Sequence, residues 1–368
     1  MLRWIFALLV FIHGFIHLMG FAKAFKLAPV NQLTSNISAT AGVLWLLACL
    51  LFIATAILFL VNKSEWWIIA VLALIVSQAL IIQYWHDAKA GTIANVIVLF
   101  AAIVAFSNWN FNKNVRAEVK QMLQDNGTGS KEIVTEDMLQ KLPEPVKNWI
   151  RNSGIIGKEK LHTVHIKQRG WMRTKPGKDK WRPTMAEQYF TIDKPGFIWR
   201  VQMEMMPLVA VSGKDKFVDG KGQMLIKAFS LINIVNDTGE KIDQGTLQRY
   251  LAEICWFPSA ALSPYIKWEA IDTTTAKATM NYNGVSGSVT FYFSKEGQIL
   301  GCSADRYKGG GKDATLEKWV VTTKGYSVMN GIKMPVKSEA TWKLKTGDFT
   351  WYKLEITEVE YNQPELNK

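Results

Sequence analysis

The distribution of apolar residues divides this chain into two parts. Four apolar blocks of about 18 to 23 residues precede position 110, at 4–21, 39–61, 66–84 and 92–109. As a helix rising 1.5 Å per residue, a block of this length crosses a hydrocarbon core of about 30 Å. Tryptophans flank the blocks, as is typical of residues at a membrane interface. The pattern predicts an α-helical membrane bundle of four transmembrane helices.

The first block also has features of a cleavable signal peptide, because Arg3 precedes it and the sequence AKA follows it at 22–24. Its length and the two histidines inside it, His13 and His17, favour a retained helix instead. Five basic residues lie on the side of the N-terminus and three on the opposite side, a bias that favours cytoplasmic ends for the bundle. We expect a multi-pass protein of the bacterial cytoplasmic (inner) membrane, with the side of the soluble part left open.

Beyond residue 161 the apolar positions recur at every second residue, which indicates β-strands. Such alternation gives each strand one covered face and one exposed face, and it is typical of antiparallel sheets. Turn signals such as Asp219-Gly220 and Asn283-Gly284 separate ten or eleven strands. The strands are expected in one hairpin at 161–193, and then at 196–206, 208–218, 222–235, 267–274, 276–283, 286–294, 297–307, 315–325, 328–345 and 349–361.

One helical stretch interrupts the strands, at 243–257. Its apolar residues recur at helical spacing, and Arg249 and Glu253 lie four residues apart, so their side chains can pair across one turn. A lone amphipathic helix among strands has to bury its apolar stripe against the sheet. We therefore expect a mainly antiparallel β domain, formed by a curved sheet or half-barrel with one inserted helix.

The predicted domain organisation has three parts. Residues 1–112 form the four-helix transmembrane domain, and residues 161–368 form the β-rich domain with its inserted helix. The segment 113–160 contains a juxtamembrane helix, a flexible linker with the sequence DNGTGS and short helices. The last of these helices starts near Pro143, since proline suits a first turn, and ends near Gly154, since glycine suits a C-terminal cap.

Charge and cysteine content limit the possible partners. The chain has 368 residues and a net charge of +12, of which the first 112 residues contribute only five basic and two acidic side chains. A basic soluble part can face anionic lipid, but no run of five basic residues favours nucleic acid, and we expect none as a partner. Of the three cysteines, Cys255 and Cys302 can pair only in an oxidising compartment, and their spacing does not decide it.

Two pairs of polar residues in the membrane part are functional candidates, because ionisable groups at membrane depth are costly. His13 and His17 lie on one helix face, and His86 precedes Asp87 at the end of the third block. Imidazole is a common ligand of metals and haem, so these four residues are candidate metal ligands. The alternative is that they form hydrogen bonds between helices. The absence of a specific metal-binding spacing favours this alternative, and we predict no cofactor.

The β-rich part shows no nucleophile-elbow, Walker or dinucleotide-binding motif. No catalytic residue is predicted. The sequence does not decide whether the protein is an enzyme, but the absence of these motifs argues against it. The covered face of the strands is rich in methionine and tryptophan, which suit an apolar ligand; an ordinary core is the alternative. The candidate ligand-binding residues are Trp171, Arg173, Trp199, Met203, Arg249, Glu253 and Trp256, with Arg173 or Arg249 placed to meet an anionic headgroup.

Three stretches resemble a bacterial family defined only as a domain of unknown function, some members of which carry an N-terminal membrane block. They are LPEPVKNWIRNSG, QRGWMRTKPGKDKWRPTMAEQYF and RYLAEICWFPSAALSPYIKWEAID, and the resemblance covers roughly residues 142–361. The motif WHDAKAGTIANVIVL looks like the membrane part of such members. The strand pattern with its inserted helix is similar to the half-barrel of Lol-type and mycobacterial lipid carriers. That similarity implies a concave sheet whose cavity accepts acyl chains, although a membrane tether departs from a freely shuttling carrier.

Together these features predict a membrane-anchored protein that binds lipid or another apolar ligand in its β domain, with membrane lipids as partners. The alternative is a structural or assembly factor of the cell envelope that acts through contacts with other envelope proteins and binds no ligand. The sequence leaves open the ligand and the oligomeric state.

Overall fold

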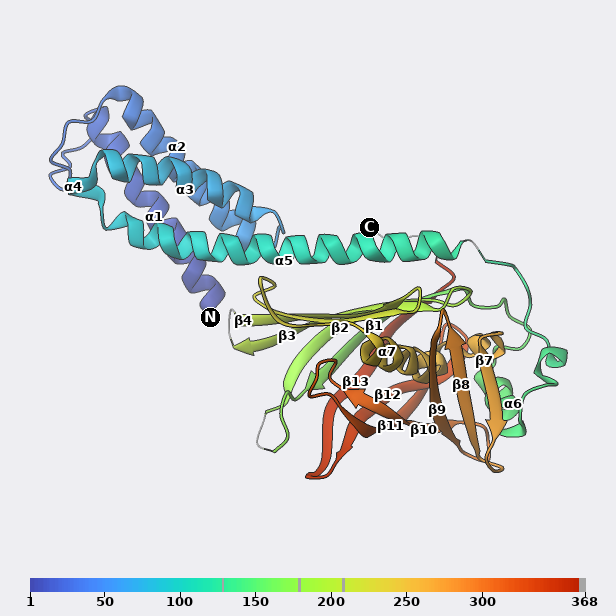
Figure 1. Cartoon of the computed structure of the whole chain (residues 1–368). Helices are drawn as coiled ribbons and strands as arrows, with labels where there is room; N and C mark the ends of the chain where they lie inside the picture. The colour runs from blue at the N-terminus through green and yellow to red at the C-terminus, as the bar shows by residue number, and fades with distance from the viewer. Residues whose placement is uncertain (128, 178–179, 207–208, 364–368) are drawn as a thin grey trace. The chain divides into compact units, whose positions relative to one another are not determined.

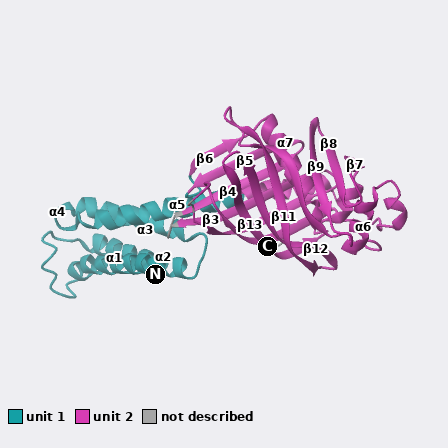
Figure 2. Cartoon of the chain, turned by 90° about the horizontal axis from the view of Figure 1, so that it is seen from below, with its two compact units in different colours: residues 1–113, 229–231 teal, residues 114–228, 232–368 magenta. Residues whose placement is uncertain are grey.

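The computed structural model describes residues 1–127, 129–177, 180–206 and 209–363 (Figure 1). The chain forms two compact units (Figure 2). The helical unit comprises residues 1–113 and 229–231, and the sheet unit comprises the remaining residues, 114–228 and 232–368. One long helix contributes to both units, since its residues up to 113 belong to the first and its later residues to the second.

The helical unit contains five helices. Four of them are long and apolar enough to cross a membrane, as the sequence predicts. Glycines let the first two helices approach closely, because a Cβ atom at Gly20 would lie only 2.2 Å from the Trp45 ring. The helices are α1 (Leu2–Ala24), α2 (Ala39–Leu60), α3 (Trp66–Gln83), the short α4 (Trp85–Ala88) and α5 (Gly91–Asn126).

A buried hydrogen-bond network joins α1, α3 and α5 inside the helical unit. His13 Nε2 lies 2.9 Å from Asn95 Oδ1, and His17 Nε2 lies 2.9 Å from the hydroxyl oxygen of Ser77. The amide of Asn95 donates to Ser77 Oγ and to Gln78 Oε1, at 3.0 Å each. The two histidines are therefore bonded to polar side chains of the neighbouring helices.

Replacing Asn95 by leucine should destabilise the helical unit by about 1–2 kcal/mol, because the buried His13 and Ser77 and the half-buried Gln78 lose their bonds to it. Unfolding of the full chain by increasing SDS in mixed micelles measures this change. Thr55→Val is the matched control, since the buried Thr55 hydroxyl bonds only within its own helix, to the Leu51 carbonyl at 2.8 Å. Equal midpoints for both variants would show that the network contributes no stability.

The strands within the described residues form a single antiparallel sheet of 13 strands. Its order is β6-β5-β4-β3-β2-β1-β13-β12-β11-β10-β9-β8-β7. Neighbouring strands in the sheet are therefore consecutive in the chain except for the pair β1 and β13, and β6 and β7 are the two edge strands. The sheet curls into a half-barrel (Figure 1), as the sequence predicts. The strands are β1 (Thr163–Met172), β2 (Arg182–Thr191), β3 (Gly196–Met206), β4 (Val209–Val218), β5 (Lys221–Ala228), β6 (Ile232–Asp237), β7 (Ile266–Ala270), β8 (Thr275–Tyr282), β9 (Val285–Phe293), β10 (Ile299–Lys308), β11 (Thr315–Met329), β12 (Ile332–Leu344) and β13 (Gly347–Tyr361).

The single strand expected at 222–235 is wrong. It is a hairpin of β5 and β6, in which Ala228 pairs with Ile232. The turn between them places Phe229 and Ser230 in the left-handed region, with φ of 54° and 55°. A bulky residue there costs about 1–3 kcal/mol, and the turn lacks the glycine or asparagine that marks the neighbouring hairpins.

The inserted helix α7 (Glu240–Glu253) lies on the concave side of the sheet (Figure 1). It packs against β4 and β5 near one end of the sheet and against β8, β9 and β10 near the other. Gly222 and Gly287 permit this approach, since a Cβ atom at either would lie within 2.8 Å of an α7 residue. The helix predicted at 243–257 begins and ends earlier, since α7 covers Glu240–Glu253. The short 3₁₀ turns η2 (Ile254–Trp256) and η3 (Pro258–Leu262) follow it.

Burial of α7 extends around the helix instead of following one apolar stripe. Gln248, Arg249 and Ala252 are buried along with the predicted apolar residues such as Leu247 and Leu251. A helix enclosed between two parts of one curled sheet has no wet face. Its polar residues therefore need partners inside the protein.

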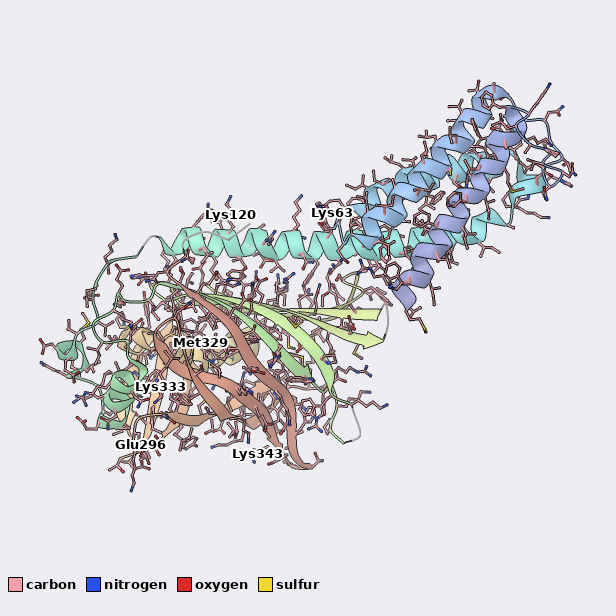
Figure 3. The ribbon with its side chains drawn as sticks, turned by 180° about the vertical axis from the view of Figure 1, so that it is seen from behind. Lys63, Lys120, Glu296, Met329, Lys333 and Lys343 are labelled. Atoms are coloured by element: carbon pink, nitrogen blue, oxygen red, sulfur yellow. The ribbon has the colours of Figure 1, made fainter. Side chains whose placement is uncertain are left out.

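The outer face of the sheet unit is covered by the second half of α5. Val115, Val119 and Leu123 are buried there, whereas Lys120 points away from the sheet (Figure 3). Glu118 fixes this half to β4 through Lys214 Nζ at 2.5 Å and Lys216 Nζ at 2.8 Å. Two shorter helices precede β1, namely η1 (Glu136–Leu139) and α6 (Glu144–Ser153), and the latter ends at Gly154 with φ 72° as predicted.

His165 forms a clamp of opposite charges on this outer face. Its Nε2 lies 2.9 Å from Glu187 Oε1, its Nδ1 lies 2.9 Å from Glu360 Oε2, and its ring stacks on Tyr189 at 4.3 Å. Burial by itself lowers the pKa of His165, but the bonds to the two carboxylates outweigh burial and raise that pKa. The bond to His165, aided by Tyr189 and Arg200, lowers the pKa of Glu187 to about 2.

These shifts predict how stability depends on pH. The stability that protonated His165 adds to the fold is fully present below its ordinary pKa of 6.5, and it is lost as the pH rises through the raised pKa of the folded protein. The contribution of Glu187 is complete above its ordinary pKa of 4.5 and is lost as pH falls towards 2. Between pH 6.5 and 9 the unfolding temperature of the full chain should therefore fall more steeply than that of His165→Gln. Parallel curves would contradict the clamp.

Candidate functional site

Arg249 on α7 forms the centre of a buried charge network on the concave face. Its Nε donates to Glu253 Oε1 at 2.9 Å, and its Nη1 donates to Asp215 Oδ2 of β4 at 2.7 Å. The guanidinium also stacks over the rings of Phe197 and Trp199, 5.1 and 4.5 Å from their centroids. Burial raises the pKa of both carboxyl groups, and the charge of Arg249 opposes that rise.

Buried amides extend the network across the floor of the half-barrel. Gln188 Nε2 donates to Glu253 Oε2 at 2.7 Å, and Gln168 Nε2 donates to Gln188 Oε1 at 3.3 Å. The indole of Trp199 and the hydroxyl of Tyr352 both donate to Gln168 Oε1 at 3.3 Å. Since each of these groups has a partner within the protein, the network is built as a structural support for α7.

A second group of residues on the concave face has a different character, and we call it the cation–aromatic row. Paired positions place Trp319 of β11 beside Trp342 of β12, and Trp342 beside Phe349 of β13. Cations lie over these rings. The row consists of Trp319, Trp342, Phe349 and Trp181 together with Arg306, Lys308 and Arg173. Lys353, which forms an ion pair with Glu339, also lies over the Trp181 ring and is not counted in the row.

The cations of this row form no direct ion pair with a described carboxylate, and Asp215 and Glu253 act on Arg306 only at longer range. Arg306 donates its Nε to the Gly245 carbonyl at 2.9 Å and lies 5.0 Å from the Trp319 ring centroid. Arg173 donates to the Thr350 carbonyl, at 3.0 Å from Nε and 2.6 Å from Nη2. Neither forms an ion pair with a described carboxylate. Burial and the nearby charge of Arg249 lower the pKa of Arg306 to about 10, and the charges of Asp215 and Glu253 oppose that shift.

Trp319 adds a hydrogen-bond donor to the same place. It is 4% exposed, and its Nε1 has no hydrogen-bond partner among the described residues. Buried donors are nearly always bonded, and exceptions call for a functional explanation. Cations without a direct ion pair and an N–H group without an acceptor are complementary to an anionic oxygen group, and the aromatic rings beside them are complementary to an apolar chain.

The structure separates the seven predicted ligand residues into three groups. Arg249, Glu253 and Trp199 meet in the buried network, and Met203 lies buried on the same strand as Trp199. Arg173 belongs to the cation–aromatic row.

Trp256 and Trp171 lie elsewhere. Trp256 is a core residue that is 3% exposed, and its Nε1 donates to the Pro335 carbonyl at 3.0 Å. Trp171 pairs with Lys353 in the sheet, is 41% exposed and lies on the opposite face of β1 from Gln168.

Sequence reasoning missed every member of the row except Arg173. The missed members are Arg306, Lys308, Trp181, Trp319, Trp342 and Phe349. The three rings on strands, Trp319, Trp342 and Phe349, are each part of an alternating strand pattern in the sequence, which was a usable sign of a shared face. Whether these rings lie side by side depends on the register between their strands, and that register cannot be derived from residue spacing.

The candidate metal ligands of the helical unit are in two different settings. His13 and His17 bond to Asn95 and Ser77, as the alternative interpretation expects. Asp87 instead accepts the backbone N–H groups of Thr34 and Ser35, at 2.8 and 3.0 Å, and joins two loops, while His86 is exposed. Within the described part of the chain no group of three His, Cys, Asp or Glu side chains is placed to hold a metal ion.

Two further features have definite places. An open pocket of about 590 Å³ lies in the loop after α1, lined by Lys23, Lys26, residues 27–31 and Leu33, all of the helical unit. Cys255 and Cys302, whose pairing the sequence left open, are free buried thiols. Burial raises the pKa of both thiols.

The fold and the site define a class of protein in which apolar helices able to cross a membrane precede a curled antiparallel half-barrel with an inserted helix. The chain belongs to a family described as "Family of unknown function (DUF6544)", whose model matches residues 132–354. This match confirms the resemblance predicted from the sequence.

Other comparisons add two solved structures. Among curated proteins, none matches the chain. A LolA superfamily protein from Nitrosomonas europaea is similar at 7% identity and a TM-score of 0.28, over 62% of this chain and 94% of that one. A β-barrel-like protein of a domain of unknown function (DUF1849) from Brucella abortus is similar at 10% identity and a TM-score of 0.24, over 55% of this chain and 98% of that one.

Proposed function

We propose that this protein is anchored by its apolar helices in a membrane and binds an anionic amphipathic molecule, a membrane lipid or a related compound, at the cation–aromatic row. The observation that carries the proposal is the pair Arg173 and Arg306, which lie over aromatic rings without a direct ion pair to a described carboxylate. An anionic headgroup would supply a direct ionic partner for these arginines and the acceptor for Trp319 Nε1. The apolar chain would lie along the aromatic rings.

This proposal assigns different roles to two arginines that the sequence treats alike. Arg249 already has two carboxylate partners, so a ligand headgroup would have to compete with Asp215 and Glu253 for it. The direct contacts of Arg306 are a backbone carbonyl and two rings, and Asp215 and Glu253 act on it without forming an ion pair. We therefore place the headgroup at Arg306 and Arg173 and treat Arg249 as part of the support for α7.

Binding of lipids by the purified full chain in neutral detergent tests the proposal. Phosphatidylglycerol and a fatty acid are the anionic probes, phosphatidylcholine is the zwitterionic probe, and tryptophan fluorescence is the readout. Arg306→Gln should weaken binding of the anionic probes by about tenfold or more, since a charge-assisted hydrogen bond contributes about 1.5–3 kcal/mol. Binding of phosphatidylcholine should change much less.

Arg169→Gln is the matched control, because it removes the same charge from the outer face of β1, where Arg169 pairs with Glu355. If both variants bind anionic lipid like the unchanged protein, or if the unchanged protein binds none of the probes, the proposal is wrong. In that case the alternative of an envelope assembly factor gains, and crosslinking in cells should recover a protein partner.

A further inference from the structure

The turn between β5 and β6 differs from every standard hairpin turn of the sheet. Other turns use Asp219-Gly220, Asn283-Gly284 or Asn330-Gly331, in which both residues have positive φ. The β5–β6 turn instead uses Phe229 and Ser230. Both residues carry a Cβ atom and are strained at positive φ. A strained backbone held by a large apolar side chain indicates that the side chain itself is needed at that position.

This turn belongs to the helical unit and not to the sheet unit (Figure 2). The Phe229 ring meets the Phe100 ring of α5 edge to face, with centroids 5.9 Å apart. The hydroxyl of Ser230 donates to Asn108 Oδ1 of α5 at 3.3 Å. Both partners lie in the apolar stretch 92–109 that is long enough to cross a membrane.

The depth of Phe100 determines the surroundings of the turn. Phe100 lies near the middle of its apolar stretch and is 57% exposed, so its ring faces lipid when α5 spans a bilayer. A residue that packs on that ring lies among acyl chains as well. The sequence of the turn suits such surroundings, because Lys227 is the only charged residue between positions 222 and 236.

Exposed apolar side chains continue from the turn along the edge strand β6. Leu231 is 47% exposed, and Ile232 and Ile234 are each 59% exposed. In water such a surface on an edge strand favours aggregation, whereas in a bilayer it is matched by acyl chains.

We propose that the β5–β6 turn, residues 229–231, is inserted in the lipid bilayer beside α5 and forms a membrane anchor separate from the transmembrane helices. The occupant of its exposed apolar surface is the acyl-chain region of the membrane. This inference is independent of ligand binding at the cation–aromatic row, because no residue of that row takes part.

Spin labelling of the full chain in lipid nanodiscs tests the insertion. A nitroxide is attached at Leu231→Cys, and its collision rates with oxygen, which concentrates in lipid, and with a water-soluble nickel chelate are compared. The native thiols Cys49, Cys255 and Cys302 are buried. The control is Ile271→Cys, which replaces a comparably exposed apolar residue, 57% against 47% for Leu231, after the opposite edge strand β7.

Oxygen should be favoured over the nickel chelate at Leu231→Cys by about tenfold relative to Ile271→Cys. In the double variant Phe229→Gly with Leu231→Cys this ratio should fall, because glycine keeps the positive-φ turn but removes the ring that meets Phe100. Ile232→Cys supplies a second labelling position. A nickel-accessible label at both Leu231→Cys and Ile232→Cys would overturn the proposal, and so would an oxygen preference that Phe229→Gly leaves unchanged.

Discussion

Replacing Arg249 by methionine is expected to lower the free energy of unfolding of the sheet unit by about 3–5 kcal/mol. The change removes the cation that Asp215 and Glu253 share while both carboxyl groups stay mostly buried, with side chains 20% and 13% exposed. An uncompensated buried carboxylate is among the most costly groups in a protein. Guanidinium-induced unfolding of the full chain in mild detergent, followed by near-UV circular dichroism, measures the loss.

The loss should also depend on pH. Burial raises the pKa of Asp215 and Glu253, and removal of Arg249 raises it further. The folded variant then binds more protons than the unfolded chain above about pH 4, so its stability falls as pH rises. The variant should therefore be nearer to the unchanged protein at pH 5 than at pH 8.

Two further variants sharpen this result. The triple variant Arg249→Met, Asp215→Asn and Glu253→Gln should recover part of the stability, because it leaves no carboxylate without its cation, although Arg306 then loses the nearby charges of Asp215 and Glu253. Arg306→Gln should cost about 1 kcal/mol, since Arg306 makes one hydrogen bond to a carbonyl. An Arg249→Met protein as stable as the unchanged chain, but unable to bind lipid, would contradict the structural role of Arg249.

Replacing Trp256 by alanine should destabilise the sheet unit by about 3–5 kcal/mol, as expected for a large buried aromatic residue. Trp256 is 3% exposed, packs edge to face on Phe190 with centroids 6.2 Å apart, and donates to the Pro335 carbonyl at 3.0 Å. It thereby joins the segment after α7 to both β2 and β12. The same unfolding experiment measures the change.

Conservative and surface variants separate packing from hydrogen bonding at this position. Trp256→Phe keeps most of the apolar contact and leaves only the Pro335 carbonyl unpaired, so its cost should be about 1–3 kcal/mol. Trp171→Ala changes a side chain that is 41% exposed on the outer face, and its effect should be much smaller. Equal losses for Trp256→Ala and Trp171→Ala would contradict a core role for Trp256.

Much of the fold could be predicted because its signals are local. The four apolar blocks match α1, α2, α3 and the first part of α5, and the strand alternation matches most strands of the sheet. The β5–β6 turn is the exception. Nothing in Phe229-Ser230 signals a turn, and the contact that accompanies it, with Phe100, is more than 100 residues away in the sequence.

The inserted helix shows where local periodicity stops being sufficient. Its apolar stripe and the Arg249–Glu253 pair are readable from spacing, and the pair is present at 2.9 Å. Its burial on the remaining faces follows from the curl of the sheet, which brings β5 and β9 to opposite sides of one helix. The isolated strand glycines Gly222 and Gly287 were the available signal, since a glycine within a strand marks a close approach.

The candidate site depended even more on the tertiary structure. Adjacent residues of a strand point to opposite faces, so Trp171 and Met172 cannot both be covered, and the structure places Trp171 outside. The cation–aromatic row combines four strands and the β1–β2 loop.

The sequence by itself determined the apolar spans, the antiparallel strand pattern, the inserted helix and the family, because each depends on residues close together in the chain. Only the tertiary structure decided which charges are compensated, since Asp215 reaches Arg249 across 34 positions while no described acidic residue pairs with Arg306. Strand register and sheet curvature set these distances, and neither is encoded in local spacing.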